Sequence, residues 1–300
     1  MMKCICCQST KFISQPLGLA RYYGCPGCGL LFRQRDKSAD ARDVLICHYQ
    51  DVDPHETVAD SKKAFFKSSL RCLSSKIRQR QRSLLDVGCG YGYFLDLAAR
   101  DGWNVSGVEI ASAAVESAKE KVGTKNIFTG SLKEAHYPDS SFDAITLWDV
   151  ADMIEDPFEE LRECFRIIEQ GGVIGIRVRN VTFQKTAYRV YLLLGKIASR
   201  LALRRPFVFH PYCFTGKSIR QLLLRSGFTK IEITNSPLTR GDPYAYTPVK
   251  GMVKMTKHII HLVSGLVLRI SAGRWIIGPS LLIWAEKPQS EKKSQDPFTP

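Results

Sequence analysis

Three glycines and one acidic residue form the first pattern in the chain that is able to do chemistry. Gly88, Gly90 and Gly92 directly follow the apolar run 83–87, and a helical pattern begins after them. Without side chains, a strand-to-helix turn lets a ligand lie against the backbone beside the helix N-terminus. Glu109 ends the next expected strand, where its carboxylate can accept hydrogen bonds from both hydroxyls of a ribose. The pattern predicts a nucleoside-containing ligand, and its Gly-x-Gly-x-Gly spacing differs from the dinucleotide fingerprint.

The residues around these glycines resemble the class I S-adenosylmethionine-dependent methyltransferases. Residues 84–95, Leu-Leu-Asp-Val-Gly-Cys-Gly-Tyr-Gly-Tyr-Phe-Leu, are very close to the first motif of that family. The resemblance continues through 102–109, 142–145 and 171–174 and covers roughly residues 81–181. It implies a Rossmann-like fold, methyl transfer and S-adenosylmethionine as cofactor. The alternative is a generic turn in another Rossmann-like protein, in particular a nicotinamide dehydrogenase.

The same resemblance implies roles for individual residues toward the cofactor. Asp86 and the glycines would face the methionine part, Glu109 the ribose, and Ser131 with Leu132 the adenine edge. The residues expected at the cofactor are Asp86, Gly88, Cys89, Gly90, Tyr91, Gly92, Glu109, Ile110, Ser131, Leu132 and Trp148.

Two residues are candidates for the chemical step. Residues 148–157 resemble a loop of a ubiquinone-biosynthesis-like subgroup, which usually carries Glu-His where this chain has Asp152-Met153. A methionine cannot take up a proton, so the role of that histidine as a base or metal ligand does not transfer to this chain. His210 stands in a His-aromatic segment resembling that of the same subgroup, which makes it the first candidate for a general base, and Asp149 is the second. The alternatives are that His210 packs a cap over the site and that Asp149 only shapes the cofactor site.

Two cysteine pairs near the N-terminus have the spacing of a metal site. Cys4-x2-Cys7 and Cys25-x2-Cys28 match a structural zinc site with four thiolates. Cys6 is able to replace Cys7, and unliganded thiols are the alternative for the whole set. The other cysteines are expected to be ordinary thiols: Cys47, Cys72, Cys89, Cys164 and Cys213.

The elements that position these residues alternate between strand and helix. Strands are expected at 83–87, 104–109, 144–148 and 173–178, with helices between them and a glycine turn at 171–172 after the helix 159–169. We therefore predict an α/β fold: a Rossmann-like, doubly wound, seven-stranded sheet whose last strand is antiparallel, with an N-terminal zinc ribbon and a helical cap. The expected parts are a zinc ribbon at 1–40, a connector and helix at 41–80, a cofactor-binding core at 81–181, a substrate cap and C-terminal part of the fold at 182–287, and a disordered tail at 288–300.

Composition and charge narrow the class of partner. The chain of 300 residues carries a formal net charge of +14 and has the apolar content of a globular protein. No apolar run reaches the length of a membrane span and no export signal is readable, so we expect a cytoplasmic protein. Basic amphipathic patterns at 182–209 and 249–270 suggest a peripheral contact with an anionic membrane, or binding of a lipid-linked acceptor.

Three functions are compatible with these features. The first is methyl transfer to a small-molecule, sugar or lipid-linked acceptor, which the subgroup resemblance favours. The second is an RNA methyltransferase that uses the zinc ribbon and the basic surface. The third is a non-catalytic scaffold that binds S-adenosylmethionine, because Met153 replaces a commonly polar residue.

Overall fold

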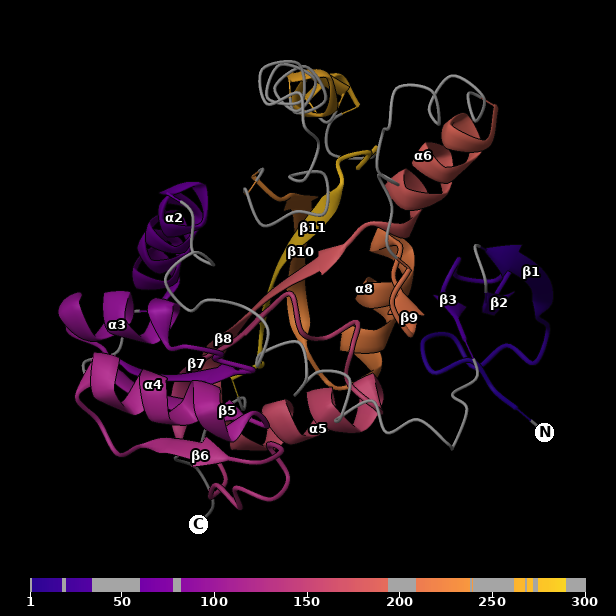
Figure 1. Ribbon diagram of the computed structural model, residues 1–300. Helices are drawn as coiled ribbons and strands as arrows, with labels where there is room; N and C mark the ends of the chain where they lie inside the picture. The colour runs from indigo at the N-terminus through magenta and orange to yellow at the C-terminus, as the bar shows by residue number, and fades with distance from the viewer. Residues whose placement is uncertain are drawn as a thin grey trace, which may run out of the picture.

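A mixed sheet with helices on both faces carries the motifs of the sequence, and a smaller sheet lies beside it (Figure 1). The computed structural model describes residues 2–17, 20–33, 60–77, 82–193, 209–237, 239, 262–267, 269–271 and 275–289. The expected connector before residue 60, residues 194–208 and most of 238–274 within the expected cap and C-terminal part, and the tail from residue 290 lie outside the described residues. No described helix is long and apolar enough to cross a membrane.

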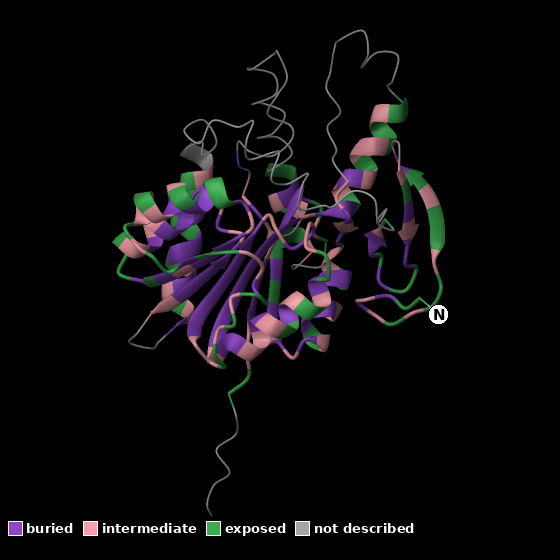
Figure 2. Ribbon diagram, turned by 60° about the horizontal axis from the view of Figure 1, so that its bottom comes forward, coloured by how far each residue is buried: buried purple, intermediate pink, exposed green. Residues whose placement is uncertain are grey.

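Within the described residues, the larger sheet has seven strands in the order β10-β11-β8-β7-β4-β5-β6. The strands are β4 (Ser83–Val87), β5 (Asn104–Glu109), β6 (Ile127–Thr129), β7 (Phe142–Trp148), β8 (Ile168–Arg179), β10 (Thr229–Asn235) and β11 (Ser280–Glu286). Strands β4 to β8 are parallel, and β11 runs antiparallel to both β8 and β10. Every residue of the central strand β7 is buried, as expected for a parallel strand covered on both faces (Figure 2). The predicted fold class, including the antiparallel last strand, is confirmed.

Helices cover the two faces of this sheet with separate apolar clusters. One face is covered by α2 (Asp60–Lys76), α3 (Tyr93–Arg100) and α4 (Ser112–Val122), and the other by α5 (Pro157–Ile167) and α8 (Gly216–Arg225) (Figure 1). A further helix, α6 (Val181–Leu193), follows β8. Because turns link the helices to the carboxyl ends of the parallel strands, the glycine turn, Glu109 and Asp149 meet at one edge of the sheet.

One predicted boundary is wrong. We expected a helix to Glu169 and a glycine turn at 171–172, but α5 ends at Ile167 and β8 already begins at Ile168. Ile168 has extended backbone angles and pairs with Phe142, and a register shift follows before the regular pairing from Val173. The two glycines therefore belong to an irregular first part of the strand.

The N-terminal cysteines lie in the turns before and between the strands of a four-stranded antiparallel sheet. Its order is β1 (Ile13–Leu17), β2 (Ala20–Gly24), β3 (Leu31–Phe32) and β9 (Tyr212–Cys213). Strand β9 follows the expected cofactor-binding core in the sequence, whereas β1, β2 and β3 precede it. Below, residues 2–33 are called the ribbon.

Candidate functional site

The glycine turn adopts a conformation that side chains would not tolerate. Gly88, Gly90 and Gly92 have φ values of 72°, 52° and 72°. A Cβ at Gly88 would lie 2.5 Å from Cγ2 of Val150, and one at Gly92 would lie 2.8 Å from Cβ of Ala118. The turn therefore needs glycine for both its backbone angles and its close packing.

Glu109 holds this turn from the neighbouring strand. Its Oε2 accepts a hydrogen bond of 2.9 Å from the backbone N–H of Gly90, and its Oε1 accepts one of 3.0 Å from Ala111. The side chain is buried. The structure thus joins two residues that the sequence assigned to one ligand, and Ile110 lies in the bend between Glu109 and Ala111.

Asp86 is a buried carboxyl group beside the turn. Thr146 Oγ1 donates a hydrogen bond of 2.6 Å to its Oδ1. Burial raises the pKa of Asp86 to about 7, with a further contribution from the charge of Glu109, although the bond from Thr146 acts in the opposite direction. Such a group changes charge readily when a cation binds beside it.

The expected adenine edge lies next to Glu109. The backbone N–H of Gly130 donates to the backbone oxygen of Glu109 at 2.9 Å, which brings the turn after β6 to the end of β5. The N–H and hydroxyl of Ser131 both donate to Glu134 Oε2 at 2.7 Å. Sequence reasoning missed Glu134, although the Ser-x-x-Glu spacing of a capping box was there to find it.

The other expected cofactor residues are largely buried side chains. Leu132 lies in the core, and Cys89 and Tyr91 are each 8% exposed. Trp148 packs edge-on against Phe65 and Phe94, with ring centroids 5.1 and 5.4 Å away. These four residues therefore offer the site backbone groups and shape more than open polar atoms.

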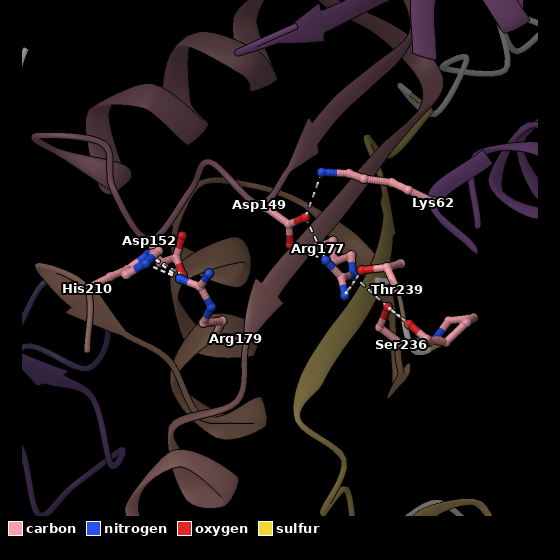
Figure 3. A network of polar contacts seen from close by, with 9 residues as sticks. Lys62, Asp149, Asp152, Arg177, Arg179, His210, Ser236 and Thr239 are labelled. Carbon is pink, nitrogen blue, oxygen red and sulfur yellow. Dashed lines mark hydrogen bonds and ion pairs between the residues drawn. The ribbon is translucent and has the colours of Figure 1, made fainter. Parts of the chain in front are cut away.

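Asp149 is locked in an ion pair with a buried arginine (Figure 3). Arg177 Nη1 lies 2.5 and 2.6 Å from its two carboxylate oxygens, and Lys62 Nζ of α2 lies 3.6 Å from Oδ2. Burial would raise the pKa of Asp149, but Arg177, Lys62 and Arg179 outweigh it and lower the pKa to about 2. A carboxylate held this way binds a proton poorly near neutral pH, which favours its alternative role of shaping the site.

Arg177 stands in the segment 177–180 after the fifth expected strand, where the sequence places reacting groups, but no role was assigned to it. It lies inside β8 and is 1% exposed, and it also donates to Ser236 Oγ at 2.8 Å and to Thr239 Oγ1 at 3.2 Å. An arginine inside an apolar strand indicates a buried ion pair, because a buried charge requires a partner.

His210 lies beside the loop that follows β7 (Figure 3). Its Nδ1 is 3.1 Å from Asp152 Oδ2, and Arg179 Nη1 contacts the ring nitrogens. The other oxygen of Asp152, Oδ1, is buried and has no hydrogen-bond partner among the described residues. The chain thus lacks a histidine at Met153 but brings one in from position 210 to the neighbouring carboxylate.

The four predicted metal ligands converge. The sulfur atoms of Cys4, Cys7, Cys25 and Cys28 all lie within 4.8 Å of one another. Cys4 and Cys28 are 3.6 Å apart and Cys7 and Cys25 are 3.4 Å apart, close to the roughly 3.8 Å between thiolates on a tetrahedral zinc with Zn–S of about 2.3 Å. Cys6 is buried beside this group but is not one of the four. The geometry of these four sulfurs fits one metal ion, and this set contains Cys7 and not Cys6.

Comparisons with known proteins agree with this architecture. The profile of a family described as a methyltransferase domain matches residues 59–233. The chain is 33% identical over 103 residues to a protein of Mycolicibacterium smegmatis named probable S-adenosylmethionine-dependent methyltransferase, covering 34% of this chain and 40% of that one. It is 29% identical over 96 residues to a ubiquinone biosynthesis O-methyltransferase of Vibrio cholerae, covering 30% and 39%. The chain thus spans about two fifths of the length of these relatives.

Solved structures share the fold at low identity. Geranyl diphosphate C-methyltransferase from Streptomyces coelicolor A3(2) matches with a TM-score of 0.50 and 12% identity, covering 84% of this chain and 100% of that one. The [4+2]-cyclase SpnF matches with a TM-score of 0.53 and 16% identity, covering 84% and 98%. Identities this low establish the fold alone, and the two names show that one fold hosts different reactions. Since the matched family profile spans more than half of the chain, this protein is a member of the methyltransferase domain family.

Proposed function

We propose that this protein transfers the methyl group of S-adenosylmethionine to a small-molecule, sugar or lipid-linked acceptor. The observation that carries the proposal is the hydrogen bond from the backbone N–H of Gly90 by which Glu109 holds the glycine turn at the carboxyl edge of the sheet. This arrangement places a ribose-binding carboxylate beside a bare backbone turn. Asp86, buried next to the turn, is suited to the cationic amino group of the cofactor.

The residues at the acceptor side are Asp152, Arg179 and His210. When bound, S-adenosylmethionine supplies an electrophilic methyl carbon. A proton on Nδ1 of His210 is held by Asp152, and Nε2 takes the proton of an acceptor hydroxyl or amine when the acceptor replaces the contact of Arg179 with this nitrogen. Arg179 contacts the ring and supplies a positive charge for an anionic acceptor group. Alignment of the acceptor with the methyl carbon remains the larger contribution, so the base adds to positioning.

Cofactor binding is tested by titrating S-adenosylhomocysteine into the protein by calorimetry. Glu109→Ala removes the acceptor of hydrogen bonds from ribose and from the turn, and Gly90→Val places a branched side chain at φ 52°. Each change should weaken binding at least about tenfold. Glu120→Ala, an exposed change on α4, is the matched control and should bind normally. Wild-type protein that ignores the ligand would rule the proposal out.

Catalysis is tested with methyl-labelled S-adenosylmethionine and a panel of phenolic, sugar and lipid-linked acceptors. His210→Ala should lower kcat by about a hundredfold, the lower end for a general base, and leave S-adenosylhomocysteine binding unchanged. Binding without turnover across the whole panel would favour the non-catalytic scaffold.

An RNA acceptor is the second candidate, because the net charge of +14 attracts anionic polymers. RNA binding with a steep salt dependence, together with methylation of the bound RNA, would replace the small acceptor. If the protein at nanomolar concentrations does not bind RNA, the RNA acceptor is ruled out.

The ribbon is proposed to hold one structural zinc ion through Cys4, Cys7, Cys25 and Cys28. The convergence of four sulfurs within 4.8 Å supports this assignment. A module of this size buries too little apolar surface to fold without such a support.

A further inference from the structure

His210 stands in a segment that the ribbon holds from both sides. The hydroxyl of Tyr22 donates to the backbone oxygen of Phe209 at 2.9 Å, and the backbone N–H of Arg33 donates to that of Pro211 at 3.0 Å. Both chain neighbours of His210 are therefore hydrogen-bonded to the ribbon. Strand β9 follows directly and pairs with β3 in the ribbon sheet.

The same segment is attached to the carboxylate that faces His210. The backbone N–H of Tyr212, in β9, donates to the backbone oxygen of Asp152 at 3.1 Å. Strand β9 thus lies between the ribbon and the loop after β7. Its position sets the 3.1 Å separation between His210 Nδ1 and Asp152 Oδ2.

The turn that carries Cys25 and Cys28, called the knuckle below, determines where β3 lies. Within the knuckle, the N–H of Cys25 donates to the oxygen of Leu30 at 2.8 Å, directly before β3. The oxygen of Cys28 accepts a hydrogen bond of 2.8 Å from Thr215 Oγ1, the N-cap of α8. A two-residue strand has little stability by itself, so the metal ligands on its N-terminal side hold it in register.

We infer that the metal-bound ribbon is a positioning element for His210, with Tyr22 as its positioning residue. The inference rests on the proposed function in one respect, which is the role of His210 as the base. Loss of the metal releases β3, then β9, and leaves the imidazole free to move away from Asp152. The ribbon therefore contributes to turnover without contacting the cofactor turn.

The test measures the reactivity of the imidazole directly in the full chain. Diethyl pyrocarbonate modifies accessible histidines, and mass spectrometry gives the rate at His210 relative to exposed His136, which lies outside the ribbon contacts. Zinc-loaded protein is compared with chelator-treated protein, and Tyr22→Phe with Tyr23→Phe. Tyr23 is the matched control because it lies on the same strand and packs its ring against Phe32.

Removal of zinc and Tyr22→Phe should each raise the relative modification rate of His210 at least threefold, and Tyr23→Phe should leave it unchanged. In a turnover assay, Tyr22→Phe should lower kcat and leave the Kd for S-adenosylhomocysteine unchanged. An unchanged rate at His210 after zinc removal, with hydrogen exchange showing that residues 2–33 have opened, would overturn the inference.

The two proposals fail in different ways. The labelling rate needs neither cofactor nor acceptor, so it reports on the ribbon even in an inactive protein. Failure of zinc-loaded wild-type protein to bind S-adenosylhomocysteine would refute the proposed function and leave the labelling result standing.

Discussion

Two carboxyl groups at the same edge of the sheet are tuned in opposite directions. Asp86 is buried with a hydroxyl partner, and its pKa is raised to about 7. Asp149 is paired with Arg177 and Lys62, and its pKa is lowered to about 2 in spite of burial. The difference follows from their partners, because a cation stabilises the charged form and a hydroxyl compensates for burial only in part.

Asp86→Asn should change the pH dependence of stability. The folded-state pKa of Asp86 lies above its unfolded value of about 3.9, so folded protein keeps a proton between about pH 4 and 7 that unfolded chain has lost. Stability from this group therefore falls as pH rises through that window. We expect the Tm of the variant relative to wild type to be higher at pH 8 than at pH 5. Asp101→Asn, an exposed change, should show no such trend.

The choice between neighbouring cysteines is open to a direct measurement. Cys7→Ser should lose the bound zinc because its sulfur is one of the four that converge, whereas Cys6→Ser should keep one zinc per chain. Metal analysis of the purified proteins gives the stoichiometry, with Cys72→Ser as a control outside the cluster. Zinc retained by Cys7→Ser and lost by Cys6→Ser would reverse the assignment.

At the scale of elements, α2 packs on one face of the sheet and contacts the residues around Asp149. Phe65 packs edge-on against Trp148, and the guanidinium of Arg177 lies 5.3 Å from the ring centroid of Phe65. Lys62, one turn earlier, reaches Asp149. A single helix thus covers the aromatic cluster and supplies a cation to the site.

Phe65→Ala should destabilise the protein by about 3–5 kcal/mol, since it removes a buried ring and leaves a cavity beside Trp148 and Arg177. Chemical denaturation gives the free energy of unfolding. Lys67→Ala, an exposed change on the same helix, should lie within about 0.5 kcal/mol of wild type. Equal effects of the two changes would contradict the packing described for α2.

Local patterns account for most of what was predictable from the sequence. The apolar strands, the glycine turn, Glu109 and the cysteine spacing each lie within a short segment, and the structure places them as expected. Strand β9 was not predictable, because two residues carry no periodicity and their partner in β3 is far away in sequence. The meeting of His210 with Asp152 has the same origin, since neither residue shows in its own neighbourhood which partner the fold brings to it.

For the whole molecule, several exposed apolar side chains lie at one end. Helix α6 follows β8, and residues 262–267 and 269–271 precede the antiparallel strand β11, so both lie at the carboxyl edge of the parallel strands (Figure 1). Leu192 and Leu193 of α6 are 58% and 85% exposed, and the exposed apolar side chains of the second segment are Leu262, Val263, Leu266 and Ile270. We propose that this end contacts an anionic membrane, to which a chain with a net charge of +14 is attracted.

Vesicle flotation tests this proposal. The protein should float with vesicles containing anionic lipid at low salt, and retention should decrease as salt increases, because surface charge attraction is screened. Leu193→Glu should reduce retention, whereas Ile13→Glu, an exposed change on β1, should not. No retention on the vesicles at low salt would contradict the proposed contact with an anionic membrane.

The four-stranded sheet, which joins β9 to the ribbon, also determines the order in which the protein can assemble during translation. Residues 20–33 leave the ribosome before β9, because Cys28 and its partner Thr215 are separated by 187 positions. At about 5–20 residues per second, roughly 10–40 s pass before that partner is synthesised. During this interval the edge of β3 has no strand to pair with, and such an edge invites aggregation. A nascent chain that loads its metal early would therefore still depend on the second half of its own synthesis to cover that edge.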